Sequence, residues 1–328
     1  MSQIYTNPWE EFKCVNYSRK KKLFKKVNYL AAIKDLKILS KIFEDAYGPE
    51  YSAIIHFELS KIFLHIHKKI SSVMSLKNKE KCYWHGIIRE KKYGKTMFSS
   101  TFLNWYNANI EIINTYENFN LTIKAKVSSL NFSIKLFKLG KFQECKNWTN
   151  SVINDLTDIP IFWYRCITIL SKCCLILNDV SSFGKYLDEM KVFADTSKKR
   201  LVNDFFLRKI WKDISAIKVI LNYIFPSYSN EIYQYNVKEI DELEDFSKKI
   251  VNYEPGTYNY YVHKIVPKYT DSKLFLFFCN WLFKKFPILE RNERNKKANL
   301  KQDESIDHEY EILLKSYGFI NDNESIAN

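Results

Sequence analysis

Glycine and proline are scarce in this sequence of 328 residues, with 7 of each. A β-sandwich or β-barrel needs a turn signal about every 8–12 residues, and so few turn-forming residues exclude that pattern. Long helices joined by short polar loops need far fewer of them. The hydrophobic content of 46%, with 16% aromatic residues, is too high for a largely disordered chain. The composition therefore predicts an all-α protein.

Long apolar runs and a cysteine framework are also missing. The longest apolar block, residues 274–279 with 281–283, is shorter than the roughly 20 residues that cross a bilayer. The 7 cysteines are odd in number and have no regular spacing, which is typical of a reducing compartment. The N-terminal residues show no charged-then-apolar signal pattern, so we expect a cytoplasmic or nuclear protein.

Motifs of catalysis and metal binding are absent from the sequence as well. Scattered glycines cannot form a phosphate-binding loop, and no nucleophile elbow or kinase motif set is present. His65 and His67 stand two residues apart in a helical run and would point in different directions. Cys166, Cys173 and Cys174 are interpreted as small core residues. We therefore expect no enzymatic activity, no cofactor and no small-molecule substrate.

Helical periodicity recurs along most of the chain. In residues 206–225, Ile210, Ile214, Ile217 and Leu221 form one apolar stripe that predicts an amphipathic helix ended by the following proline. The same reasoning predicts helices at residues 29–43, 51–69, 101–117, 121–139, 142–156, 160–177, 180–195, 238–251 and 272–285.

The middle of the chain contains a repeat. The segment SIKLFKLGKFQECKNWTNSVI (133–153) is followed by TILSKCCLILNDVSSFGKYLDEM (168–190), and superposing Gly140 on Asn178 aligns them 38 residues apart. In each, an apolar helix ends at a residue that tolerates positive φ, and an amphipathic helix follows. Such hairpins, a degenerate tetratricopeptide pattern, bury their apolar faces only by stacking. The sequence predicts a tetratricopeptide-like α-solenoid of antiparallel helical hairpins.

The domain organisation follows from where this periodicity begins and ends. We predict a basic N-terminal segment at residues 1–27 that leads into the first helix, and a single α-solenoid domain at residues 28–286. Residues 287–306 lack periodic apolar positions and are predicted to be a linker. Residues 307–328 are predicted to form a short helix and a disordered acidic tail.

The formal net charge of +14 is unevenly distributed. Residues 1–100 hold 20 Lys and Arg against 9 Asp and Glu, whereas residues 303–328 hold 7 acidic residues and one lysine. Part of the total reflects a Lys/Asn/Ile-rich composition. The asymmetry predicts two electrostatically different surfaces.

The most concentrated positive charge is RKKKLFKK, residues 19–26, and Lys34, Lys37 and Lys41 continue it along the next predicted helix. Three interpretations stay open: a protein interface or solvated edge, which is favoured, an anionic lipid site, and a nucleic-acid site. The run also matches a nuclear localisation signal. The candidate partner-binding residues are Arg19, Lys20, Lys21, Lys22, Lys25, Lys26, Lys34, Lys37 and Lys41 on the basic side, and Asp303, Glu304, Asp307, Glu309 and Glu311 on the acidic side.

Four segments carry a resemblance to a known family. VNYSRKKKLFKKVNYLAAIKDLKIL (15–39) has a Lys/Arg cluster split by Leu and Phe, and it is followed by LFKLGKFQECKNW (136–148), YLDEMKVFAD (186–195) and DISAIKVILNYIFP (213–226). In this order they resemble the huntingtin-associated protein of about forty kilodaltons, also called the coagulation factor VIII intron protein family. The chain lacks the family's Ala/Gly-rich N-terminal tract and its long proline-rich insertion.

The resemblance implies a tetratricopeptide-like α-solenoid that binds and stabilises huntingtin, one to one, between the large lobes of that HEAT-repeat protein. It further implies a link to Rab5 on early endosomes and to vesicle trafficking, with membranes reached only indirectly. On this basis we expect a non-enzymatic interaction subunit whose basic edge and acidic tail meet opposite charges on the partner. The alternatives are a soluble attachment protein of the SNARE-disassembly type, which the polar ending NDNESIAN disfavours, and a nucleic-acid-binding solenoid.

Overall fold

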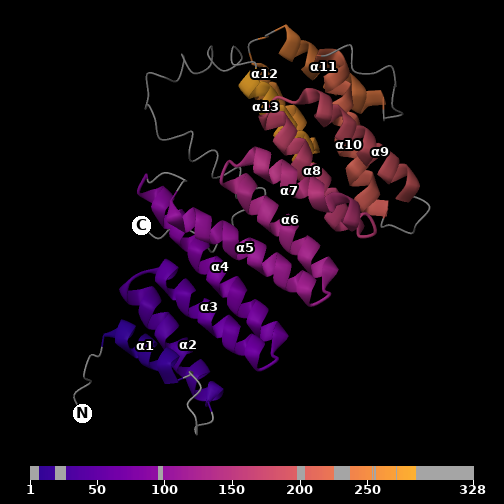
Figure 1. The fold of residues 1–328 in the computed structure, drawn as a ribbon. Coiled ribbons are helices and arrows are strands. Elements are labelled where there is room, and N and C mark those ends of the chain that lie inside the picture. The colour runs from indigo at the N-terminus through magenta and orange to yellow at the C-terminus, as the bar shows by residue number, and fades with distance from the viewer. Residues whose placement is uncertain are drawn as a thin grey trace. The chain divides into compact units, whose positions relative to one another are not determined.

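The computed structural model describes residues 7–18, 27–94, 99–197, 204–224, 237–252, 254, 256–270 and 272–285. Every regular element in these ranges is helical and none is a strand, so the predicted all-α class is confirmed. Consecutive helices form stacked antiparallel hairpins of the α-solenoid type (Figure 1). The chain divides into two compact units: unit 1 is Met1–Leu139 with Asn154–Leu156, and unit 2 is Gly140–Ile153 with Thr157–Asn328.

The other predictions on domain organisation are untested. The single solenoid domain over residues 28–286 stays a prediction. Residues 287–306 and 307–328, predicted as a linker and as a short helix with an acidic tail, lie outside the described residues.

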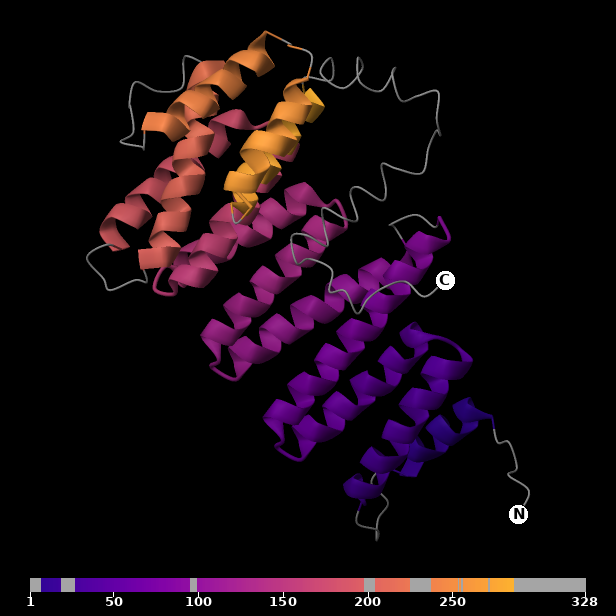
Figure 2. The same cartoon turned by 180° about the vertical axis from the view of Figure 1, so that it is seen from behind.

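Unit 1 is a row of helices in which each helix packs against the next one along the chain. Figures 1 and 2 show this row from opposite sides, with neighbouring helices running in opposite directions. Its elements are α1 (Pro8–Ser18), α2 (Tyr29–Ala46), α3 (Pro49–His65), α4 (Lys69–Lys92), α5 (Ser100–Asn118), α6 (Thr122–Lys138) and the 3₁₀ turn η1 (Asn154–Leu156).

Unit 2 begins with the same serial packing and then departs from it. Its elements are α7 (Phe142–Ile153), α8 (Pro160–Ile176), α9 (Val180–Ser197), α10 (Asp204–Ile224), α11 (Val237–Val251), α12 (Thr257–Tyr260), the π-helical turn η3 (Tyr261–Ile265), the 3₁₀ turn η4 (Val266–Lys268) and α13 (Lys273–Lys285). Helix α13 packs against both α8 and α10, which precede it by many residues. The rings of Phe183 and Phe278 stack with centroids 5.7 Å apart, which fixes α13 beside α9.

Helix α1 is an element that the sequence analysis did not predict, because residues 1–27 were interpreted as a basic segment. No residue of α1 is buried, yet Trp9, Phe12 and Val15 pack against the core of α2 and α3. The Asn7 side chain accepts a hydrogen bond from the Trp9 N–H at 3.0 Å, and Pro8 follows at the first helical position. This Asn-Pro pair is the feature of the sequence that could have predicted where the helix begins.

Helix α4 was also missed, although its 24 residues make it the longest helix described. Four of its nine buried residues, Ser72, Ser75, Glu80 and Gly86, are polar or small. Small residues let helices approach closely, and a β-carbon at Gly86 would lie only 3.0 Å from the methyl group of Thr101. A search for apolar periodicity does not recognise a face of this kind.

Several hairpin turns depend on one residue in the left-handed region. Gly140 has φ of 76° and Asn178 has φ of 60°, as the aligned repeat predicted. His67 and Asn120 adopt the same conformation after α3 and α5. In each non-glycine case the next residue's N–H donates to a carbonyl five residues back, for example Asp179 to Cys174 at 2.8 Å, which terminates the helix.

Replacing His67 with glycine should stabilise the protein. His67 is exposed, and a left-handed conformation costs an L-residue about 1 kcal/mol that glycine does not pay. We expect His67→Gly to raise the free energy of unfolding by up to about 1 kcal/mol, measured by urea denaturation. Asn120→Gly is the matched control and should gain less, since asparagine tolerates this region. A destabilised His67→Gly protein would contradict the argument.

Candidate partner-binding surface

Three of the predicted partner-binding residues lie in the described structure. Lys34, Lys37 and Lys41 are exposed on α2, and they share its outward side with Leu30 and Ile38, which are 71% and 52% exposed. This part of the predicted basic edge is therefore a mixed surface of cations and apolar side chains. The other predicted residues lie outside the described residues: Arg19, Lys20, Lys21, Lys22, Lys25, Lys26, Asp303, Glu304, Asp307, Glu309 and Glu311.

The local sequence explains why α2 presents these lysines outward. Ile33, Leu36 and Phe43 are buried against α3, and the lysines occupy positions rotated away from that stripe. The helix begins at Asn28, whose side chain accepts a hydrogen bond from the Ala31 N–H at 3.1 Å. The cap and the apolar stripe together fix which face of α2 meets solvent.

A groove of about 340 Å³ lies between α1 and α2. Its walls combine apolar side chains with two carboxylates, a chemistry that suits a side chain with an apolar stem and a cationic end. Since sequence reasoning had placed no helix at residues 8–18, it could not find this groove. The lining residues are Glu11, Cys14, Val15, Asp35, Ile38 and Leu39.

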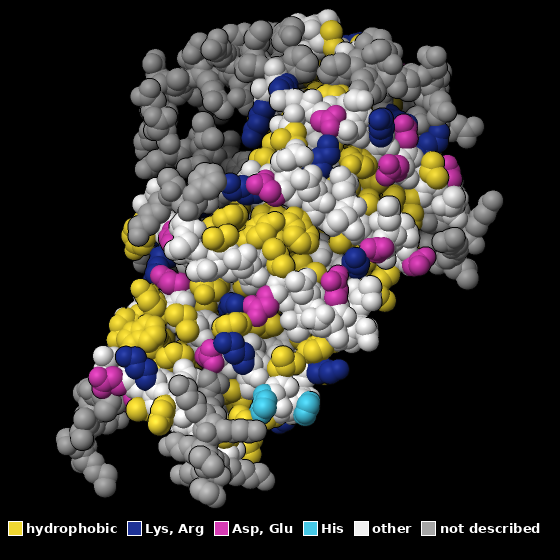
Figure 3. Space-filling model, viewed as in Figure 1, with side chains coloured by type: hydrophobic (Ala, Val, Ile, Leu, Met, Phe, Trp, Pro, Cys, Tyr) yellow, Lys and Arg dark blue, Asp and Glu magenta, His cyan; other side chains and the backbone are white. Residues whose placement is uncertain are grey.

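An aromatic cluster occupies the same end of unit 1. The Trp9 ring meets the buried Phe43 edge to face, with centroids 4.6 Å apart, and contacts Tyr47 and Tyr51 at 6.3 and 6.2 Å. Both tyrosines are 40% exposed. Figure 3 shows hydrophobic side chains gathered near this N-terminal end. Exposed Trp and Tyr side chains are enriched at protein interfaces.

Exposed large apolar side chains are concentrated in unit 1 generally. Of the 20 found among the described residues, 14 belong to unit 1 and 6 to unit 2. The two units contribute similar numbers of described residues, so the difference is one of surface chemistry. The 14 are Tyr17, Leu30, Ile38, Ile42, Tyr47, Tyr51, Ile54, Leu64, Ile70, Met74, Ile88, Tyr93, Leu103 and Ile123.

A buried carboxylate joins three helices of unit 1. Glu80 on α4 accepts hydrogen bonds from the Trp105 indole N–H on α5 at 2.5 Å and from the Lys135 ammonium on α6 at 2.7 and 2.9 Å. Lys135 also lies 5.3 Å from the centre of the Trp84 ring. Trp105 is fully buried, so its donor depends on Glu80. The sequence analysis did not predict these contacts. The one feature that indicated them was a carboxylate, Glu80, among the inward-facing positions of α4.

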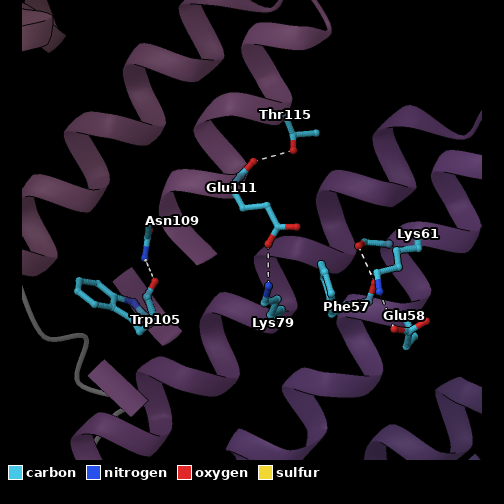
Figure 4. Close-up of polar contacts among 9 residues, drawn as sticks. Phe57, Glu58, Lys61, Lys79, Trp105, Asn109, Glu111 and Thr115 are labelled. Carbon is cyan, nitrogen blue, oxygen red and sulfur yellow. Dashed lines mark hydrogen bonds and ion pairs between the residues drawn. The ribbon is translucent and has the colours of Figure 1, made fainter. Parts of the chain in front are cut away.

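A second set of polar contacts joins α3, α4 and α5 (Figure 4). Lys79 pairs with Glu111 at 2.6 Å, and its ammonium group lies 4.0 Å from the centre of the Phe57 ring. Lys61 lies 4.1 Å from the same ring and pairs with Glu58 at 2.8 Å. These cations are used within the molecule, so they contribute to stability more than to partner binding.

Unit 2 contains a buried group of titratable side chains. The Tyr164 hydroxyl donates to Asp213 at 2.9 Å, and Asp213 is fully buried. Lys172 is 3% exposed and lies 5.1 Å from the centre of the Phe277 ring. Burial and the nearby Lys273 lower the pKa of Lys172 to about 8, against the opposing effect of Asp213. The ammonium and carboxylate have no exposed face that a substrate could approach.

Within the ranges described, no cluster of three or more His, Cys, Asp and Glu side chains could hold a metal ion. His65 instead packs its ring 5.0 Å from that of Tyr29. None of the described helices combines the length and apolar character needed to cross a membrane.

Compared with known proteins, the chain matches no family model and no curated protein.

Removing the Glu80 carboxylate should destabilise unit 1. Glu80→Ala leaves the buried Trp105 N–H without an acceptor, so we expect a loss of about 2–3 kcal/mol in the free energy of unfolding, measured by urea denaturation. Glu80→Gln keeps one acceptor and should lose less. Glu117→Ala, an exposed change on α5, is the control. Equal losses from Glu80→Ala and Glu117→Ala would contradict this role.

The contribution of Lys172 to the free energy of unfolding should rise with pH. Between pH 8 and 10.5 the unfolded chain holds a proton that folded Lys172 has released, so this contribution increases across the window. The difference between wild type and Lys172→Met should grow by about 3 kcal/mol over the whole window, measured by urea denaturation with reductant. A constant difference for Lys172→Met would contradict the assignment.

Proposed function

We propose that this chain is a non-enzymatic interaction subunit that binds a large helical-repeat protein in a one-to-one complex. The observation that supports this most directly is the surface of unit 1, where exposed apolar side chains alternate with lysines. Leu30 and Ile38 share the exposed side of α2 with Lys34, Lys37 and Lys41. Patches in which apolar side chains are exposed together with a cationic rim are typical of protein interfaces.

The partner that the resemblance indicates is huntingtin, a HEAT-repeat protein. The segment at residues 15–39 carries the resemblance, and it overlaps α1 and α2, where the groove and the aromatic cluster lie. The stacked helices of unit 1 offer an extended surface that a second helical repeat could cover. We propose the Rab5-linked early-endosome setting on the resemblance alone.

The test is an affinity pull-down of the tagged full chain from its native cells, with identification of stoichiometric proteins. We expect one HEAT-repeat protein at one to one. The variant Lys34→Glu/Lys37→Glu/Lys41→Glu should reduce its recovery about tenfold at physiological salt, because reversed rim charges repel the surface they had attracted.

The matched control changes three exposed lysines of unit 2 by the same total charge: Lys185→Glu/Lys264→Glu/Lys285→Glu. Its recovery should equal that of wild type. Recovery of SNARE proteins, or of polynucleotide that nuclease removes, would replace the proposal with one of the alternatives. Equal recovery by both triple variants would show that the α2 lysines take no part in binding.

A further inference from the structure

The longest helix of unit 1 presents a face that no other described element covers. Helix α4 packs against α3 on one side and α5 on the other. Its exposed apolar residues Ile70, Met74 and Ile88 are 76%, 53% and 42% exposed. With the exposed Lys81, His85 and Lys92 they fall within an arc of about 60° at 100° of rotation per residue. We call these six residues the α4 outer face.

The charge on α4 is segregated between its two sides. Both of its carboxylates are turned inward: Glu80 binds Trp105 and Lys135, and Glu90 accepts hydrogen bonds from Ser99 and Thr101 at 2.5 and 2.7 Å. The exposed positions of α4 therefore include cations and no acidic residue. A surface with cations and no competing carboxylate favours an acidic ligand.

The cations that flank the face are already engaged within the unit. Lys77 lies 5.5 Å from the centre of the Tyr116 ring, and Arg89 pairs with Glu50. Lys81, at the middle of α4, and Lys92, at its C-terminal end, are exposed and form no ion pair or ring contact with another described residue. The cationic centre of the face is thus Lys81, with Ile70 and Met74 before it and Ile88 after it.

The face is also rigid, because the inward side of α4 is anchored. The Glu80 contacts join it to α5 and α6, the Lys79–Glu111 pair joins it to α5, and the Arg89–Glu50 pair joins it to α3. A helix held at these points loses little conformational entropy when a ligand covers its free side.

We infer that the α4 outer face binds an acidic amphipathic helix of the partner, a step that rests on the proposed function. Ile70 and Ile88 are 18 residues apart, about 27 Å along the axis, so a partner helix of about five turns spans the face. Its apolar side chains meet Ile70, Met74 and Ile88, and its carboxylates meet Lys81 and Lys92. A polyphosphate backbone would leave the three apolar side chains without a contact, which favours a protein ligand.

The test compares two double variants of the tagged full chain in the same pull-down. Lys81→Glu/Ile88→Asp changes the face, and Ile161→Asp/Lys185→Glu makes the same two changes at exposed positions of unit 2. We expect the first to recover about tenfold less partner and the second to match wild type. Thermal melts followed by circular dichroism check that both variants are folded. A carbodiimide cross-linker, which joins amines to carboxylates, should link Lys81 to an acidic residue of the partner.

The outcomes separate this inference from the proposed function. If wild type recovers no stoichiometric partner, the proposed function is wrong and the inference falls with it. If wild type recovers a partner and Lys81→Glu/Ile88→Asp does so equally well, only the inference is wrong. Cross-links from Lys81 to Asp303–Glu311 of the same molecule would overturn it in favour of the chain's own tail. Binding of wild type but not the variant to phosphatidylserine vesicles, with partner recovery unchanged, would overturn it in favour of a lipid surface.

Discussion

The burial of each helix against its neighbours along the chain is the interaction on which the structure depends. A helix such as α2 buries Leu36 and Phe43 completely because α3 supplies Ile55 and Leu59 on one side and α1 supplies Trp9. Neither helix could bury that surface alone. The short left-handed turns, the buried carboxylate of Glu80 and the docking of α1 all act on helices already positioned by this packing.

Serial packing has a second consequence, because a helix with a neighbour on each side still has a free side. In unit 2 α13 returns onto α8 and α10, and the buried Lys172 lies 5.1 Å from the centre of the Phe277 ring of α13. Unit 1 has no such returning helix among its described elements. Its free sides carry the exposed apolar residues, which is why these residues are more numerous in unit 1 than in unit 2.

The fold was largely predictable because its determinants are local. The predicted helices around Leu36, Ile210 and Phe275 contain strong apolar stripes, and the two turns at Gly140 and Asn178 have the residue types that a left-handed conformation favours. The helices α1 and α4 were not predicted, because contacts with other helices stabilise them more than a local apolar stripe does. One has no buried residue, and the inward face of the other includes serines, a glycine and a glutamate.

The charge of the surface was harder to predict than the fold, because it depends on which charged side chains form contacts within the protein. Lys34, Lys37 and Lys41 could be recognised as a cationic edge from sequence alone. Lys79 and Lys81 read alike in the sequence, yet one is paired with Glu111 and 13% exposed while the other meets solvent. Likewise Glu80 and Glu90 offset two of the seven Lys and Arg residues of α4 in a count of charge. Their inward hydrogen bonds take both carboxylates away from the exposed side of the helix, and a side that carries cations without carboxylates favours an acidic ligand.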